Sequence, residues 1–210
     1  MKNIIALTIS LLPFNLLRIF LYNKILRYNI NKNSSIGFLT IINSKDCKIE
    51  DSQICSFNYI KIKRINIKSS KIYFFNIIKN FYSLTISQNS ILKNKNKFYG
   101  EIKVNDNSKL EINENCQIGS ENFFDLSGNV KIKDNCKILN YCQFWTHGFN
   151  SNREIKIGNI EIGENVILEN SVTVISDIKI TSNCIIKISS IVNRSLHEEN
   201  TYSSNILIKK

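Results

Sequence analysis

The stretch QFWTHGFN, residues 143–150, holds the side chains of this sequence that are best suited to chemistry. It contains the only tryptophan, Trp145, and one of the 2 histidines, His147. Imidazole exchanges a proton near neutral pH, so a well-placed histidine can remove the proton of a hydroxyl group and make its oxygen nucleophilic. The other histidine, His197, stands beside two glutamates and is expected to face solvent. His147 is therefore the candidate base.

A repeat of six residues surrounds His147 and must position it. Six segments begin with an aliphatic residue, carry Asn three places later and end on an aliphatic residue at six; they start at Ile86, Val104, Ile112, Ile132, Ile162 and Ile180. Near the C-terminus the aliphatic spacing is strict: Ile162, Leu168, Val174, Ile180, Ile186 and Val192. Neither an amphipathic helix nor an alternating strand has this period. Short strands joined by corners have it, with one large apolar side chain per hexad pointing inward.

The repeat breaks directly after His147. A second run at the same spacing ends on an aromatic residue: Leu126, Ile132, Ile138 and Phe144. The next inward positions would be Asn150 and Lys156, which cannot enter an apolar interior unpaired. We therefore predict a loop at about 148–158. A histidine at the mouth of such a loop, beside a large aromatic residue, is placed to meet a ligand.

The composition limits the other interpretations. The net charge is +11, but the lysines are scattered and no nucleic-acid motif accompanies them, so we expect solvated surface lysines, with an anionic cofactor, sugar or membrane as the alternative. The 6 cysteines lack CxxC or zinc-site spacing, and four of them hold small inward positions of the repeat: Cys116, Cys136, Cys142 and Cys184. With only 7 Gly, the corners are expected to use Asn, which tolerates positive φ.

The sequence near the N-terminus, after Pro13, predicts an amphipathic helix. After Pro13, an apolar stripe recurs at helical spacing: Leu16, Leu17, Phe20, Leu21 and Ile25. This stripe would either pack on the body of the protein or lie on an anionic membrane surface. Asn15 and Arg18 make a membrane-spanning helix unfavourable, and no cleavage site of a signal peptide follows.

The hexads resemble those of the hexapeptide-repeat proteins, over most of the chain after about residue 35. The resemblance implies an all-β fold, a left-handed parallel β-helix in which three hexads make one coil. It would stack Ile162 on Ile180, Leu168 on Ile186 and Val174 on Val192. We expect an N-terminal amphipathic helix and linker over residues 1–34 and the β-helix over residues 35–210. Between residues 42 and 81 the register slips, and coils are placed only loosely there.

Within that family, QFWTHGF, preceded by FFDLSGNVKI, is similar to acetyltransferases that modify bacterial surface polysaccharides. The resemblance implies a homotrimer that transfers an acetyl group from acetyl-CoA to a sugar hydroxyl, less readily to an amino group, with His147 as the base. The cysteine pattern makes a reducing cytoplasm the expected setting. Zinc enzymes of the family need several imidazoles, so no metal is expected with His147 and His197 alone. No nucleic-acid partner is expected either.

The remaining site residues are assigned from their places around the Thr-His pair. Asp125 could pair with the imidazole, and Asn129, one coil before His147, could orient it, although both residues also form turns. Substrate contacts are expected from Trp145, Thr146 and Phe149. Contacts to the acyl donor are expected from Lys187, Ser189, Arg194 and Lys209.

Two alternatives remain open. Many relatives carry a Gly-Ala-Gly-Ser run where this chain has residues 187–190, Lys-Ile-Ser-Ser, and this departure favours a catalytically inactive β-helix scaffold. The other alternative is a peripheral membrane binding module that acts through the N-terminal helix, at the inner face of the cell membrane.

Overall fold

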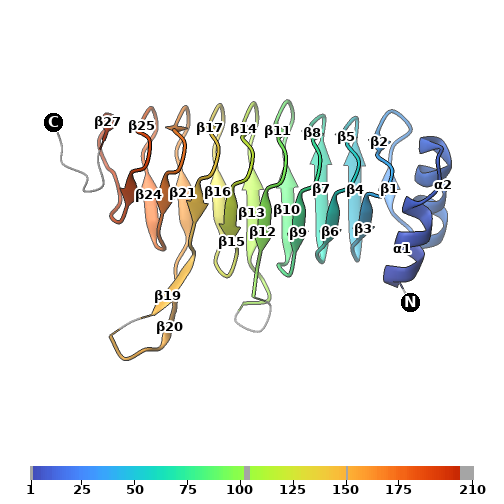
Figure 1. Ribbon diagram of the computed structural model, residues 1–210, viewed down its shortest axis with the longest axis horizontal. Helices are drawn as coiled ribbons and strands as arrows, with labels where there is room; N and C mark the ends of the chain where they lie inside the picture. The colour runs from blue at the N-terminus through green and yellow to red at the C-terminus, as the bar shows by residue number, and fades with distance from the viewer. Residues whose placement is uncertain (1, 102–104, 150, 204–210) are drawn as a thin grey trace.

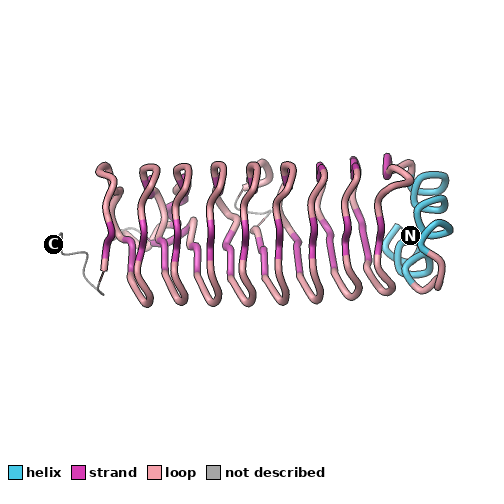
Figure 2. The backbone as a smooth tube through the Cα atoms, turned by 90° about the horizontal axis from the view of Figure 1, so that it is seen from above, coloured by secondary structure: helices cyan, strands magenta, loops and turns pink. Residues whose placement is uncertain are grey.

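In the computed structural model, which describes residues 2–101, 105–149 and 151–203, the chain winds into a β-helix with two helices at its N-terminal end (Figure 1). Seen from above, the coils lie side by side along one axis and the helices close the end of the stack (Figure 2). The predicted all-β parallel β-helix is confirmed.

Each complete coil contributes one strand to each of three parallel sheets, and β27 adds a further strand to the second. The first sheet contains β1 (Asn29–Ile30), β4 (Asp46–Glu50), β7 (Arg64–Lys68), β10 (Ser83–Ile86), β13 (Lys109–Ile112), β16 (Val130–Ile132), β21 (Ile160–Ile162) and β24 (Ile178–Ile180). The second contains β2 (Ser35–Ile36), β5 (Gln53–Ile54), β8 (Lys71–Ile72), β11 (Ile91–Leu92), β14 (Gln117–Ile118), β17 (Lys137–Ile138), β22 (Ile167–Leu168), β25 (Ile185–Ile186) and β27 (Thr201–Tyr202). The third contains β3 (Ile41–Asn43), β6 (Tyr59–Lys61), β9 (Ile77–Lys79), β12 (Lys97–Tyr99), β15 (Phe123–Asp125), β18 (Gln143–Phe144), β23 (Thr173–Val174) and β26 (Ile191–Val192).

The core is a set of columns of inward aliphatic and aromatic side chains. The predicted pairs are confirmed: Ile162 on Ile180, Leu168 on Ile186 and Val174 on Val192. The four cysteines assigned to small inward positions are buried and unpaired. Burial of these columns is the main stabilising contribution, because each coil hides its apolar side chains only by stacking on its neighbours.

Asparagine makes one column of corners, as expected. Positive φ values occur at Asn89, Asn115, Asn135, Asn165 and Asn183. One assigned hexad is wrong: Asn107 is not at such a corner but in the segment between β12 and β13, where its backbone N–H bonds to Asn105, and Val104 lies outside the described residues. Other corners use larger residues at positive φ, including Leu39 and Phe57, so asparagine replaces glycine at only part of the turns.

The coils between residues 42 and 81 are regular, although the hexad pattern hides them. The inward residues Ile36, Ile42, Ile49 and Ile54 follow one another at spacings of six, seven and five, and the next coil repeats them. The sum remains eighteen residues per coil, so the strands pair in register. A search for a strict period of six misses this arrangement.

Two helices, not one, cap the β-helix: α1 (Lys2–Ser10) and α2 (Asn15–Leu26). The first coil begins at β1, ahead of residue 35. The buried face of α2 carries Arg18, Ile19, Tyr22 and Leu26, whereas most of the predicted apolar stripe is exposed. Of this stripe only Leu21 packs against the core, so the interpretation that the stripe packs on the body is wrong for Leu16, Leu17, Phe20 and Ile25. Within the described residues, no helix is long and apolar enough to cross a membrane.

Arg18 explains the orientation of α2. Its guanidinium donates hydrogen bonds to the carbonyl oxygen of Ile36, at 2.9 and 2.7 Å, and to that of Leu12. The carbonyl of Ile36 lies in β2 of the first coil, and that of Leu12 lies after α1. A polar group buried without a partner is costly, so the three bonds hold this face of α2 toward the coil.

Candidate active site

His147 lies where the chain leaves the β-helix. β19 (His147–Phe149) pairs antiparallel with β20 (Ile155–Ile157) to form a hairpin that projects from the side of the coils (Figure 1). The hairpin closes through the backbone N–H of Gly158, which donates to the carbonyl of Thr146 at 2.8 Å. The predicted loop is confirmed, and it places the imidazole at the base of the hairpin, beside the coil surface.

Asp125 holds the imidazole. Its Oδ2 atom lies 2.8 Å from Nδ1 of His147. Asp125 ends β15, in the coil that precedes β18, so the pairing of these two strands sets the distance between the two side chains. The carboxylate side chain is 7% exposed and the imidazole 37% exposed. A carboxylate that accepts a hydrogen bond from Nδ1–H leaves the other ring nitrogen unprotonated, in the form that can act as a base.

Asp125 is itself fixed by other donors. Its Oδ2 accepts bonds from the backbone N–H groups of Thr146 and His147, at 2.8 and 2.9 Å, and from the hydroxyl of Thr146 at 2.8 Å. Its Oδ1 accepts from the hydroxyl of Ser127 at 2.8 Å. Burial raises the pKa of this carboxyl, but the hydrogen bonds from His147, Ser127 and Thr146 outweigh burial and hold the pKa below its ordinary value. Asp125 is therefore ionised at neutral pH.

Thr146 is a positioning residue, and its assignment as a substrate contact is wrong. Its side chain is fully buried. The hydroxyl bonds to Asp125 and accepts the backbone N–H of Gly128 at 2.7 Å. Thr146 thus ties the carboxylate to the neighbouring turn, and a ligand in solution has no access to it.

Asn129 does not orient the imidazole in this structure. Its side-chain oxygen accepts the backbone N–H of Lys109 at 2.9 Å, and its own N–H donates to Asn159 at 2.9 Å. Asn129 belongs to a column of turn residues at the corner of the coils. The turn interpretation of Asn129 holds, and the orienting contact comes from Asp125.

A pocket of about 520 Å³ opens beside the Asp125–His147 pair. The predicted Trp145 and Phe149 line it, and Trp145 packs against Phe123 with 4.9 Å between ring centroids. The remaining lining residues were not assigned from the sequence: Tyr99, Gly100, Glu101, Phe123, Ser127 and Ile155. Aromatic walls with a few polar groups at one end are typical of sites that bind small molecules or sugars.

Aromatic residues also stack inside the coils beneath the pocket. Phe98, Phe124 and Phe144 are fully buried, with centroid distances of 4.7 and 4.2 Å between neighbours. Phe124 directly precedes Asp125 in β15. The stacked rings fix the height of successive coils and so support the geometry of the pair above them.

The sequence contained a signal for two of the missed residues. Ser127 stands in the same FDLSG segment as Asp125, two places on, where a hydroxyl can bond back to a carboxylate. Glu101 follows Gly100, where the segment before β13 interrupts the hexads as the hairpin does after β18. Breaks in the repeat therefore mark the pocket on both sides.

The residues assigned to the acyl donor do not line this pocket. Lys187 pairs with Glu169, with 2.8 Å between Nζ and Oε1, on another corner of the coils. Ser189 occupies a corner with a φ of 59°, and Arg194 is exposed beyond β26. Lys209 lies outside the described residues. No group of three or more side chains suited to metal binding occurs among the described residues.

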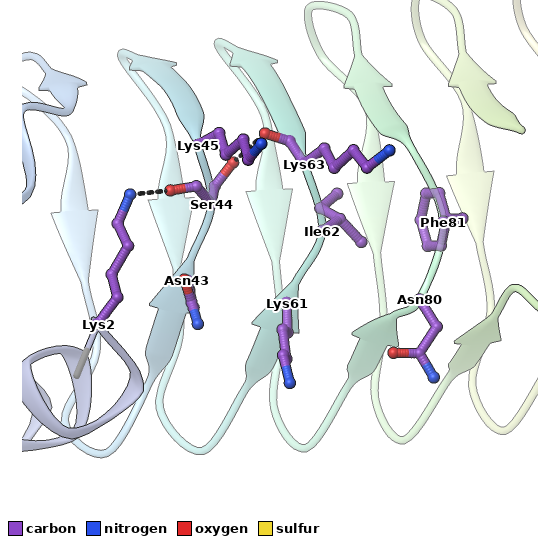
Figure 3. Close-up of a pocket in the computed structure, with 9 residues that line it drawn as sticks. All are labelled: Lys2, Asn43, Ser44, Lys45, Lys61, Ile62, Lys63, Asn80 and Phe81. Atoms are coloured by element: carbon purple, nitrogen blue, oxygen red, sulfur yellow. Dashed lines mark hydrogen bonds between the residues drawn. The ribbon is translucent and has the colours of Figure 1, made fainter. Parts of the chain in front are cut away.

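A second pocket, of about 290 Å³, lies toward the N-terminal end (Figure 3). It is lined by Lys2 of α1 and by residues at the ends of β3, β6 and β9 and in the turns that follow: Asn43, Ser44, Lys45, Lys61, Ile62, Lys63, Asn80 and Phe81. It shares no lining residue with the pocket at His147, and four of its residues are lysines.

No family model matches the chain, and no curated protein matches it. Among solved structures, the chain is similar to the polySia specific acetyltransferase NeuO, with 16% identity, a TM-score of 0.46 and coverage of 87% of this chain and 79% of that chain. The polysialic acid O-acetyltransferase OatWY gives 16% identity, a TM-score of 0.44 and coverage of 87% and 84%. A maltose O-acetyltransferase from Clostridium difficile 630 gives 19% identity, a TM-score of 0.37 and coverage of 72% and 68%.

Proposed function

We propose that this protein transfers an acetyl group from acetyl-CoA to a hydroxyl group of a sugar in a bacterial surface polysaccharide or its precursor. The observation that carries the proposal is the Asp125–His147 pair at the edge of an aromatic pocket. The Thr-His element at the break of the hexads, which resembles that of polysaccharide acetyltransferases, supports the same assignment. We place the protein in the cytoplasm, which its cysteine pattern favours, and propose a homotrimer, as the resemblance implies.

In the proposed reaction the ring nitrogen of His147 that faces away from Asp125 takes the proton of the acceptor hydroxyl. The acceptor oxygen forms a bond to the thioester carbonyl carbon, and the carbon–sulfur bond breaks. The thiolate of coenzyme A leaves and takes the proton back from His147. Asp125 stabilises the imidazolium that forms between these steps, because its carboxylate remains charged and bonded to Nδ1.

The pocket suits the two reacting ends of the substrates. Trp145 and Tyr99 offer aromatic faces against which a sugar ring can lie, and Glu101 offers a carboxylate for its hydroxyl groups. The nucleotide part of acetyl-CoA is anionic, and among the residues that the structure describes no lysine or arginine lines this pocket. We propose that this part lies outside the pocket, between neighbouring subunits, with Arg194 and Lys187 among its contacts.

The test is transfer to a panel of acceptors. Purified protein is incubated with acetyl-CoA and oligosaccharides that are neutral, amino-substituted or acidic, and the release of thiol and the mass of the product are measured. A product that carries the acetyl group on oxygen, with an amine-specific control showing that it is not on nitrogen, supports the proposal. Absence of acetyl-CoA binding in calorimetric titration at millimolar concentration contradicts it and favours the scaffold interpretation.

A further inference from the structure

We infer that the two N-terminal helices dock on an anionic lipid bilayer through apolar side chains that face away from the β-helix. This surface, which we call the apolar cap, consists of exposed residues of α1, α2 and their connection: Ile4, Leu7, Leu11, Phe14, Leu16, Leu17, Phe20 and Ile25. The inference does not depend on the proposed transferase activity, because no residue of the cap belongs to the site at His147.

The exposure of the apolar cap is unusual in its extent. Its side chains are between 40% and 70% exposed, although all are large aliphatic or phenyl groups. Single exposed apolar residues are common on soluble proteins, but gathered ones mark a surface that contacts a partner or a membrane. The helices lie together at one end of the molecule, so the cap is presented away from the coils (Figure 1).

The helices cannot bury the cap by turning. The opposite face of α2 is held against the first coil by Arg18, whose guanidinium bonds the carbonyls of Ile36 and Leu12. Tyr22 on the same face bonds with its hydroxyl to the carbonyl of Thr40 at 3.0 Å. Rotation of α2 would leave these buried polar groups without partners. The apolar side chains are thus fixed outward.

The positive charge of the N-terminal end of the molecule favours an anionic partner. The first acidic residue of the chain is Asp46, whereas residues 1–45 contain Lys2, Arg18, Lys24, Arg27, Lys32 and Lys45. Arg18 is used internally, and Lys24, Arg27, Lys32 and Lys45 are exposed. A second copy of this surface would bring like charges together. An anionic bilayer instead accepts apolar side chains at its interface and attracts each cation by about 1 kcal/mol.

The second pocket, which four lysines line, adjoins the apolar cap and adds positive charge to this end of the molecule. We call it the lysine pocket. Lys2 belongs to α1 and bonds to the carbonyl of Ser44, which also lines the pocket (Figure 3). Lys45 and Lys61 extend from the neighbouring coils, and both are exposed. Lys63 is paired with Asp106 at 3.6 Å. Phosphate groups of lipids at the edge of the docked helices would meet these ammonium groups.

The test is flotation of the full chain with vesicles of phosphatidylcholine and phosphatidylserine in equal parts, compared with vesicles of phosphatidylcholine alone. We expect binding to the mixed vesicles at low salt, and weaker binding to phosphatidylcholine. The double variant Leu16→Ser/Phe20→Ser should lower the partition coefficient about tenfold or more, because two large side chains no longer enter the interface. The matched control, Ile175→Ser/Ile188→Ser, changes exposed side chains of the β-helix and should bind as the unmodified protein does.

A second variant tests the charge. Lys45→Glu/Lys61→Glu should reduce binding to the mixed vesicles by roughly tenfold to a hundredfold. Circular dichroism of each variant establishes that it is folded. Absence of flotation with the mixed vesicles, or equal flotation of the Leu16/Phe20 variant, would overturn the inference. Self-association in sedimentation velocity without lipid that is lost in the Leu16/Phe20 variant and kept in the matched control would assign the cap to a second copy of the chain instead.

Discussion

The Oδ2 atom of Asp125 lies 2.8 Å from Nδ1 of His147, although the two residues belong to different coils. The coil of Asp125 stacks on that of His147 through Phe124 and Phe144, so the register of two core residues sets a contact between two polar ones. The same carboxylate oxygen accepts the backbone N–H of His147. The carboxylate of Asp125 therefore holds both the imidazole ring and the backbone of His147, which favours a single orientation of the imidazole.

The first prediction concerns Asp125→Asn. The amide oxygen can accept only part of the hydrogen bonds that the carboxylate accepts, and the imidazole loses its charged partner. If the amide NH2 group of Asn faces Nδ1, it donates a hydrogen bond to it, so the ring proton moves from Nδ1 to the other nitrogen and the base is removed. We expect kcat for acetyl transfer to fall by about 10²–10⁴-fold. The measurement is acceptor-dependent thiol release from acetyl-CoA. Asp106→Asn, at an exposed carboxyl, is the matched control and should keep its kcat.

The second prediction concerns stability against pH. The pKa of Asp125 is lower in the folded protein than in the unfolded chain, so its contribution to stability is complete above the unfolded value, about 3.9, and is lost as the pH falls through the folded value. We expect the free energy of unfolding of the unmodified protein to decrease below about pH 4. In Asp125→Asn this decrease should be smaller. Parallel urea unfolding curves at several pH values measure it, and identical pH profiles would contradict the assignment.

The third prediction concerns the base of the hairpin. A side chain at Gly128 would collide with the carbonyl oxygen of Gly158 and crowd Thr146. We expect Gly128→Ala to destabilise the protein by about 1–3 kcal/mol, because backbone atoms cannot move aside cheaply. Gly148→Ala is the control within the same hairpin, since nothing lies near its Cβ position. Thermal unfolding compares them, and an equal melting temperature for both variants would refute this account of the turn.

The fourth prediction concerns the outer wall of the pocket. Phe149 is largely exposed and has no role in holding the Asp125–His147 pair, so it can only contribute to binding. Phe149→Ala should raise KM for the sugar several-fold and leave kcat within about twofold. Steady-state kinetics with varied acceptor measures both constants. A fall in kcat with unchanged KM would place Phe149 in the chemical step instead.

The β-helix was predictable because its C-terminal coils keep a strict spacing of six residues between large apolar side chains. Ile162 and Ile180 stack because each hexad contributes one large side chain at a fixed spacing. The first coils escaped the prediction because Ile42 and Ile49 are seven residues apart, and the following interval of five restores the register. A corner of the backbone can contain one residue more or fewer without disturbing the pairing of strands. A search with a fixed period of six does not detect such a change.

The site was predictable at its centre and not at its edges. His147 was found because the inward pattern cannot continue past it. The burial of Thr146 was not predicted, because neighbouring residues of a motif can face opposite sides of the coil. The spacing of α2 gave its apolar stripe correctly but not the side that faces the body. Arg18 decides that side through carbonyl groups that come from Leu12 and Ile36, outside α2.

The central claim, that His147 is the base of an acetyl transfer, is tested most directly by comparing the unmodified protein with His147→Ala. Acetyl-CoA binding is measured by calorimetric titration, and turnover by thiol release with a sugar acceptor that the unmodified protein uses. The account predicts equal affinity for acetyl-CoA and a kcat at least about 10²-fold lower in the variant. Turnover by the variant at the rate of the unmodified protein would contradict it.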